Sequence, residues 1–171
     1  MSKEIILRAL EPQDIDLIYA WENDPEVWQQ SISHVPFSRH TLTQYVIESA
    51  STDIYSAKQL RLMADDAVTG HTVGCIDLSS FDPYHRRAEI GMLIDRQFRG
   101  QGYGRPIVEA LVSFCRTSLQ LHQLYCDIAV NNAASVRLYT SLGFRQQGIR
   151  TDWVWTPDGY VDAILFSKII D

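Results

Sequence analysis

An apolar segment that runs directly into a glycine-rich turn constrains the fold more than any other feature of this sequence. Residues 89–94, EIGMLI, have the composition of a buried strand, and glycine follows at positions 100, 102 and 104. Pro106 is tolerated only in the first turn of a helix, so the next helix begins near Gly104–Arg105. The sequence therefore predicts a strand, a tight turn and a helix in immediate succession.

This turn has the chemistry of an anion site. Glycines at alternate positions allow successive main-chain N–H groups to point inward without a clash from a Cβ atom. A helix N-terminus directly behind them adds unpaired donors and the positive end of a dipole. Such a combination suits a phosphate or a pyrophosphate. An ordinary flexible loop is the alternative, so other segments must decide between the two.

Composition limits the class of protein. With 171 residues, 46% hydrophobic and 21% charged, the chain is expected to fold as one domain spanning 1–171. No apolar run approaches the roughly 20 residues of a membrane helix, and MSKEIILRAL lacks the pattern of a secretory signal. We therefore expect a cytoplasmic protein that does not enter a membrane.

Charge and cysteine content exclude further classes. A formal charge of −6 disfavours nucleic acid as a partner and mildly favours a cationic substrate. Cys75, Cys115 and Cys126 are widely spaced within apolar patterns, which predicts three buried thiols rather than a disulfide framework. The cysteines and the five histidines lack the spacing of a zinc site, so no metal is expected.

The order of elements defines the fold class. Strands are expected at 4–10, 58–65, 71–79, 87–94, 124–130, 144–150 and 160–169. One helix carries Ile15 to Trp21, a second follows the cap Ser38, a third starts near Gly104, and a fourth runs from Asn132 to Leu142 before Gly143. The order β-α-α-β-β-β-α-β-α-β-β predicts an α/β (α+β) protein with a mixed sheet and helices on both faces. The two early helices could form a lid or one wall of a cleft.

Two sequence motifs follow one another along the chain, each at the start of a predicted helix. Arg99-x-x-Gly102-x-Gly104 opens a helix after a strand, and Asn132 followed by Leu138-Tyr139-x-x-Leu142-Gly143-Phe144 forms the next helix. Together they resemble the acyl-CoA motifs of the GCN5-related N-acetyltransferase (GNAT) superfamily. Residues 7–10 (LRAL) and 21–27 (WENDPEV) resemble the branch with spermidine N-acetyltransferases and ribosomal-protein N-terminal acetyltransferases. Residues 85–89 (HRRAE) are similar to the spermidine enzymes in particular. The resemblance covers essentially the whole chain.

The resemblance implies acetyl-CoA as co-substrate and a set of contacts for it. Its diphosphate would lie on the main-chain N–H groups of seven residues, which are Arg99, Gly100, Gln101, Gly102, Tyr103, Gly104 and Arg105. In this family the strand before the turn splays from the strand after the helix, and the pantetheine arm fills the gap. That would assign main-chain contacts to Met92, Leu93 and Ile94, whose side chains remain in the core. Asn132 can cap its helix and also reach the cofactor.

Two side chains are the catalytic candidates. The family places a general acid at the position of Tyr139, whose hydroxyl would protonate the departing CoA thiolate. The alternative for Tyr139 is packing against Gly143-Phe144. Glu89 is the first choice to accept a proton from the amine, with Asp77 and Asp82 as alternates. An ion pair with Arg86 or Arg87 is the competing role for Glu89.

The resemblance implies acetyl transfer to a primary amine by direct attack in a ternary complex. Two departures affect the acceptor. The spermidine enzymes carry a glutamate near Ser80 and acidic residues where this chain has His34 and Val35. A water relay therefore becomes a plausible proton path. A polyamine such as spermidine is the first acceptor considered; a protein N-terminus or another small amine, such as an amino acid or an aminoglycoside, stays open. So do a catalytically weak acetyl-CoA sensor and a homodimer.

Other nucleotide-binding classes fit poorly. A dinucleotide fold requires Gly-x-Gly-x-x-Gly rather than the alternating spacing found here. A P-loop requires Gly-Lys-Ser/Thr, which the turn lacks.

Overall fold

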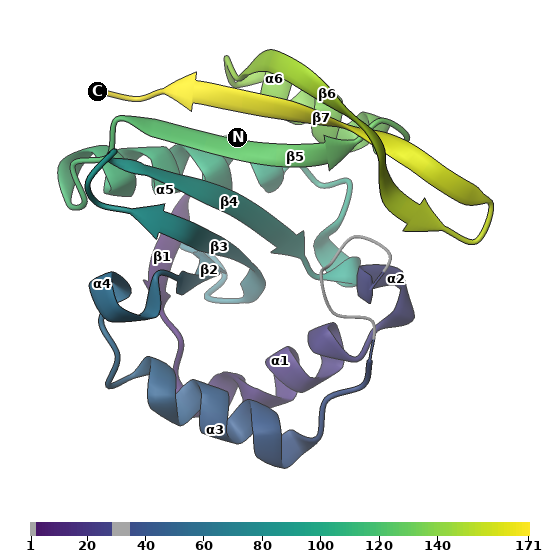
Figure 1. Ribbon diagram of the computed structural model, residues 1–171. Helices are drawn as coiled ribbons and strands as arrows, with labels where there is room; N and C mark the ends of the chain where they lie inside the picture. The colour runs from purple at the N-terminus through teal and green to yellow at the C-terminus, as the bar shows by residue number, and fades with distance from the viewer. Residues whose placement is uncertain (1–2, 29–34) are drawn as a thin grey trace.

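The computed structural model describes residues 3–28 and 35–171, so His34 lies outside the described residues. In this part of the chain, seven strands form one sheet in the order β1-β2-β3-β4-β5-β7-β6 (Figure 1). The strands are β1 (Ile5–Ala9), β2 (Leu60–Asp66), β3 (Thr72–Asp82), β4 (Arg87–Ile94), β5 (Gln123–Ala129), β6 (Arg145–Thr156) and β7 (Gly159–Ile169). The α-helices are α1 (Ile15–Glu22), α2 (Pro25–Trp28), α3 (Arg39–Ser49), α4 (Ile54–Ala57), α5 (Gly104–Thr117) and α6 (Ala133–Ser141).

The sheet divides between its two central strands. Strands β4 and β5 are parallel and joined through α5, as a crossover connection requires. They pair over three positions, the last of which is Glu89 with Tyr125. Beyond this pair β4 stays with β3 and β5 stays with β7, so the two strands diverge (Figure 1). Within the described residues, no strand pairs with the β5-facing edge of β4 over residues 90–94.

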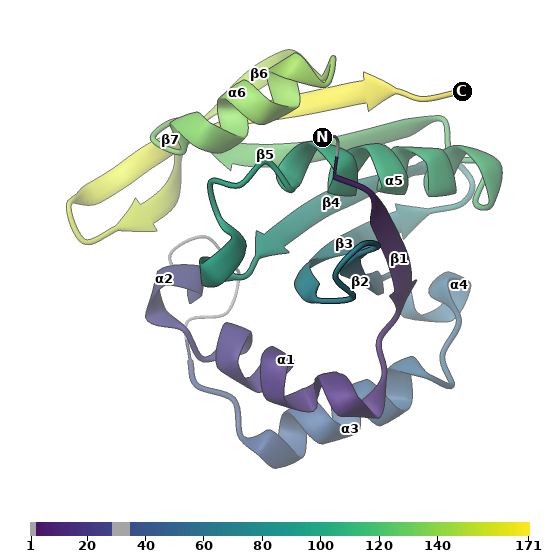
Figure 2. The ribbon, with the colours of Figure 1, turned by 180° about the vertical axis from the view of Figure 1, so that it is seen from behind.

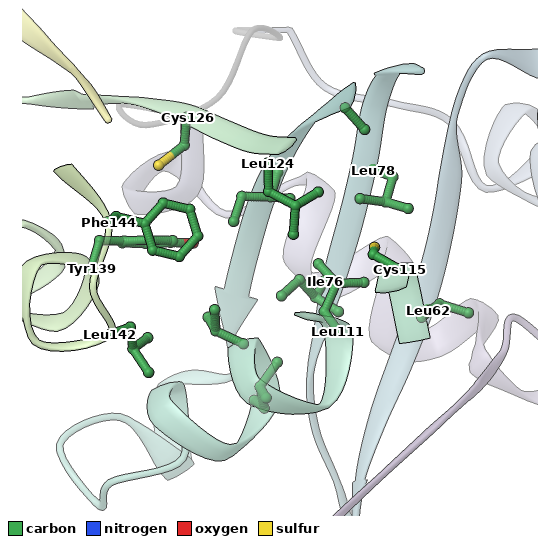
Figure 3. Packing of buried hydrophobic residues seen from close by; sticks show 14 of the residues in the cluster. Leu62, Ile76, Leu78, Leu111, Cys115, Leu124, Cys126, Tyr139, Leu142 and Phe144 are labelled. Atoms are coloured by element: carbon green, nitrogen blue, oxygen red, sulfur yellow. The ribbon is translucent and has the colours of Figure 1, made fainter. Parts of the chain in front are cut away.

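Helices cover both faces of the sheet, as the sequence predicts. Helix α5 lies across one face of the sheet (Figure 2). Ile76 and Leu78 of β3 point toward Leu111 of this helix (Figure 3), and Ile107 belongs to the same buried cluster. Cys75, the residue before Ile76 in the strand, points to the opposite face and packs with side chains from α1 and α3. The second cluster contains Ile18, Trp21, Leu42, Val46 and Met63.

The predicted helix caps are confirmed. The Ser38 side chain accepts a hydrogen bond from the N–H of Thr41 at the start of α3. Asn132 accepts from the N–H of Ser135 at the start of α6, and α6 ends before Gly143, whose φ is +83°. Helix α5 begins at Gly104, where Pro106 places it.

Several elements differ from the predicted pattern. Helices α2 and α4 and the two 3₁₀ turns, Pro12–Asp14 and Arg96–Phe98, are too short to give an apolar periodicity. Strand β3 extends to Asp82 through an irregularity that leaves Ser80 at φ +49°. Strand β6 extends to Thr156 through a second irregularity with Asp152 at φ +50°. Such bulges break the alternation from which strand ends are predicted.

No helix in the described ranges is both long and apolar enough to cross a membrane.

Candidate active site

The glycine-rich turn presents main-chain donors at the end of the divergent strand β4. Gly100 and Gly102 adopt φ angles of +73° and +85°. For residues 99–105, the described part of the protein supplies no acceptor to the main-chain N–H groups. Residues 99–102 are exposed, whereas Tyr103 and Gly104 are buried. The turn therefore offers a row of unpaired donors beside the N-terminus of α5.

The two predicted motif glycines have different physical reasons. An added Cβ at Gly102 would meet no atom of the described residues within 4 Å, so the left-handed backbone angle is what favours glycine there. At Gly104 the added Cβ would lie 2.8 Å from Cδ2 of Leu138. The close contact at Gly104 is therefore with a side chain of α6.

Side chains of the turn are already engaged with the protein. Arg99 donates through Nε to the carbonyl of Ile94 at 3.0 Å and through Nη1 to Glu26 at 3.3 Å. The Nε2 atom of Gln101 donates to the carbonyl of Gln97 at 2.6 Å. Arg105 donates to the hydroxyl of Ser141 at 2.9 Å, which ties α5 to α6. Anion binding at the turn would therefore rely first on the main chain.

The three predicted residues of β4 have the expected core side chains. Met92 and Ile94 pack against the cluster on the α5 face, and Leu93 packs against the cluster on the α1 and α3 face. Their main-chain edge toward β5 lies in the divergent part of the sheet. A ligand that pairs with this edge would replace the missing strand.

Tyr139 lies on α6 with 4% of its surface exposed. Its ring packs edge-on against Phe144 with centroids 5.0 Å apart (Figure 3). Burial raises the pKa of Tyr139 above its ordinary value, with a smaller contribution from Cys126. Tyr139 therefore both packs and carries a protonated hydroxyl at neutral pH.

Asn132 acts as the cap of α6, with Oδ1 3.2 Å from the N–H of Ser135. This contact accounts for its structural role, and contact with a cofactor stays a prediction.

Glu89 occupies the last paired position before β4 and β5 diverge. The hydroxyls of Ser79 and Ser80 donate to its Oε2 at 3.4 and 3.3 Å. The competing ion pair is not found in the described structure, because Arg87 contacts Asp82 at 3.4 Å and Arg86 donates to the carbonyl of Gln120. Sequence reasoning missed both serines. Ser79 stands opposite Glu89 in the register of β3 and β4, and Ser80 joins it through the bulge, which has no sequence signature.

The alternate carboxylates have other partners. Asp82 accepts from the N–H groups of Tyr84 and His85 and so shapes the β3–β4 turn. Asp77 stands opposite Gly91 of β4, and Arg61 donates to both of its oxygens at 2.8 Å. The same guanidinium donates to Glu22 at 2.6 Å, which connects α1 to the sheet. Arg61 was not predicted from the sequence.

A cavity of about 310 Å³ lies on the same face of the sheet as Glu89, beside its partner Tyr125. It is lined by Arg87, Gln123, Tyr125, Gln147, Arg150, Leu165 and Ser167. Arg150 is paired with Asp127 at 2.8 Å. The cavity therefore provides space and hydrogen-bonding groups next to the candidate proton acceptor.

The site combines divergent strands, a glycine-rich turn and a following helix. Comparison with protein families identifies the class of protein to which this arrangement belongs. Residues 4–145 match the family described as "Acetyltransferase (GNAT) domain", and the chain belongs to this family. It is an N-acetyltransferase that uses acetyl-CoA as its acetyl donor.

Individual relatives cover the full chain. It is 26% identical over 175 residues to a spermidine N(1)-acetyltransferase of Vibrio cholerae, covering 100% of this chain and 98% of the relative. It is 23% identical over 166 residues to the L-amino acid N-acetyltransferase AaaT of Escherichia coli, covering 97% and 98%.

A solved structure confirms the fold. The spermidine N-acetyltransferase from Vibrio cholerae, in complex with CoA and spermine, superposes with a TM-score of 0.88 at 24% identity. The match covers 98% of this chain and 96% of that one.

Proposed function

We propose that this protein transfers an acetyl group directly from acetyl-CoA to a primary amine within a ternary complex. The diphosphate of acetyl-CoA would bind the main-chain N–H groups of residues 99–105, and the pantetheine arm would pair with Met92, Leu93 and Ile94. One observation carries this proposal. The β5-facing edge of β4 is unpaired over residues 90–94 in the described structure, and it leads into a turn whose main-chain N–H groups have no acceptor among the described residues. Asn132, at the start of α6, completes the proposed cofactor contacts.

The proposed chemistry moves protons both at the amine nitrogen and at the thioester sulfur. An alkylammonium titrates near ~10, so an amine must lose a proton before its nitrogen can attack the thioester carbon. Glu89 would accept this proton through a water molecule, positioned by the hydroxyls of Ser79 and Ser80. Attack opens the carbonyl to an oxyanion and leaves the nitrogen with one proton too many. The C–S bond then breaks as the carbonyl re-forms, and Tyr139 would donate its proton to the CoA thiolate. The second proton of the nitrogen would return to the Tyr139 phenolate through solvent, which gives the neutral amide.

The proposed acceptor is a polyamine of the spermidine type. Similarity to the Vibrio cholerae enzyme over the whole chain supports this choice. So do the charges on this face: Glu22 and Asp77 share the single guanidinium of Arg61, and Glu89 lies one strand away. A formal charge of −6 for the chain attracts cationic substrates in the same sense.

A second acceptor class is favoured by one specific observation. The cavity beside Tyr125 contains Arg87 and Arg150. Each already contacts one carboxylate, Asp82 and Asp127 respectively, and a guanidinium has further N–H donors for a second. An amino acid or a protein N-terminus with an acidic side chain would place its carboxylate there. The amine would then lie toward Glu89.

A thiol-release assay separates these acceptors. The protein is mixed with acetyl-CoA and, separately, with spermidine, amino acids, aminoglycosides and short peptides, and free CoA thiol is followed. We expect release with spermidine to exceed both the amine-free rate and the rates with the other amines. Faster release with an amino acid or peptide would replace the polyamine by the second class. Binding of CoA without release for any amine would instead support a sensor and overturn the enzymatic mechanism.

We propose further that residues 1–171 act as one domain in the cytoplasm and associate as a homodimer. The exposed aromatic side chains of the β6–β7 hairpin, Trp153, Trp155 and Tyr160, support self-association. Light scattering coupled to size exclusion tests this, and a mass of one chain at micromolar concentration would contradict it.

A further inference from the structure

A buried hydrogen bond connects the glycine-rich turn to a distant hairpin. The hydroxyl of Tyr103 donates to Oδ2 of Asp66 at 2.7 Å, across 37 positions of the sequence. Tyr103 is 4% exposed and Asp66 is 5% exposed. Tyr103 immediately precedes Gly104, the first residue of α5. The end of the turn is therefore fixed at the point where the helix begins.

Asp66 is itself held rigidly. Its Oδ1 accepts hydrogen bonds from the N–H groups of Val68 and Thr69, each at 2.9 Å, within the β2–β3 turn. Its main-chain carbonyl accepts from the N–H of Gly70. The Tyr103 hydroxyl, followed by the Thr69 N–H, lowers the pKa of Asp66 to about 2. Tyr103 therefore binds an ionised, fully ordered acceptor rather than a mobile side chain.

The beginning of the turn rests on the same hairpin. Phe98 packs edge-on against the ring of Tyr103, with centroids 5.8 Å apart, and His71 lies 6.2 Å from Phe98. Lys3 covers the Tyr103 ring at 3.7 Å. The exposed residues 99–102 thus span two aromatic side chains that the β2–β3 hairpin holds in place.

We infer that Asp66 is a positioning residue for acetyl-CoA: through Tyr103 it holds residues 99–105 in the conformation whose N–H groups converge on the diphosphate. This inference rests on the proposed function of that turn. Asp66 touches neither the proposed acceptor site nor Tyr139. Loss of the bond would lower the fraction of molecules with a binding-competent turn, which weakens apparent affinity by that fraction. Saturating acetyl-CoA would restore the competent population, so kcat would be spared.

The test compares four single variants. Tyr103→Phe keeps the ring but removes the hydroxyl, and Asp66→Ala removes the acceptor. Asp66→Asn keeps a hydrogen-bonding side chain of the same shape. Asp53→Ala is the matched control, because Asp53 accepts from the N–H groups of Tyr55 and Ser56 at the start of α4 and makes no recorded contact with the turn. The measurements are the Kd of CoA by calorimetry, the KM of acetyl-CoA, kcat and the Tm.

Tyr103→Phe and Asp66→Ala are each expected to raise the Kd of CoA and the KM of acetyl-CoA about tenfold, because a hydrogen bond to a charged group is lost. Their kcat at saturation should stay within about twofold of the original. Asp66→Asn should give a smaller increase. A double variant that combines Tyr103→Phe with Asp66→Ala should bind CoA with the same Kd as Asp66→Ala alone, since both changes remove the same bond. Asp53→Ala should lower the Tm with an unchanged Kd.

An unchanged Kd in both Tyr103→Phe and Asp66→Asn, with a lower Tm, would make the bond structural only and overturn the inference. Asp66→Asn decides the matter if Tyr103→Phe does not fold. The proposed function fails differently: the unaltered protein would then bind no CoA, or would bind it with the same affinity in Gly102→Ala.

Discussion

The two sides of the proposed site differ in the atoms that they present. On the cofactor side, the unpaired groups belong to the main chain of β4 and of residues 99–105, while the nearby side chains of Arg99 and Arg105 are tied to other parts of the protein. On the acceptor side, Glu89, Asp77, Glu22 and Arg61 present charged side chains, several of them paired with one another. A site made from the main chain depends on backbone conformation, whereas a site made from side chains changes with single substitutions. We therefore expect single substitutions on the acceptor side to change the choice of amine more readily than they change cofactor binding.

Tyr139→Phe gives the largest expected effect. The substitution keeps the packing against Phe144 and removes the proposed proton donor, so kcat should fall about 10²- to 10⁴-fold with the Kd of CoA unchanged. Tyr84→Phe is the control, since Tyr84 is 88% exposed, and should leave kcat unchanged. Full activity in Tyr139→Phe would reject the proposed role.

The pH dependence of kcat tests the proposed role of Tyr139 in a second way. Burial raises the pKa of Tyr139, so the hydroxyl keeps its proton over the neutral and mildly alkaline range. A raised pKa means that the donor form is present below it and is lost only above it. We therefore expect no alkaline decline of kcat between about pH 7 and 9, and a decline centred in that range that Tyr139→Phe abolishes would contradict this assignment.

Glu89→Gln tests whether Glu89, rather than another carboxylate of the acceptor side, accepts the proton of the amine. Removing the proposed proton acceptor should lower kcat about 10²-fold, because a glutamine cannot take the proton of the amine or its bridging water. Asp82→Asn is the matched control: Asp82 caps the β3–β4 turn, so kcat should change less than about twofold while the Tm falls. An equal loss of kcat in both variants would show that Glu89 has no special role.

Gly102→Ala tests the cofactor side. At φ +85° an alanine would cost about 1–2 kcal/mol of backbone strain, and the turn would relax away from its present conformation. The Kd of CoA should rise about tenfold, because a smaller fraction of the protein would have the turn in its binding-competent conformation. Gly159→Ala, at φ +116° in the β6–β7 turn, should lose stability without a change in Kd. Equal Kd values in the two variants would remove the turn from the proposed site.

The smallest effect concerns the thiols. Burial raises the pKa of Cys75, Cys115 and Cys126 to about 12 each, so roughly one molecule in ten thousand carries a given thiolate at pH 8. The native protein should react negligibly with a disulfide reagent over the minutes of a thiol-release assay, and unfolded protein should react fully. Rapid reaction of the native protein would show that one of these cysteines is accessible.

The conformation of the glycine-rich turn and of the helices around it could be predicted from the sequence because its determinants are local. Glycine at positions 100 and 102, Pro106 after the turn, Asn132 as a cap and Gly143 at a helix end each act within a few residues. The acceptor side could not be predicted to the same depth. Arg61 meets Glu22 across 39 positions, Ser79 faces Glu89 through strand register, and Ser80 reaches Glu89 through a bulge. Tyr103 was predicted as a main-chain donor, while its buried bond to Asp66 depends on the three-dimensional fold.

The most direct test of the central claim is a crystal structure of this protein in complex with CoA. The account predicts diphosphate oxygens within about 3 Å of several main-chain nitrogens of residues 99–105, with the pantetheine arm along the edge of β4 beside Tyr139. A diphosphate bound elsewhere, with the turn left unoccupied or filled by the protein's own side chains, would contradict it.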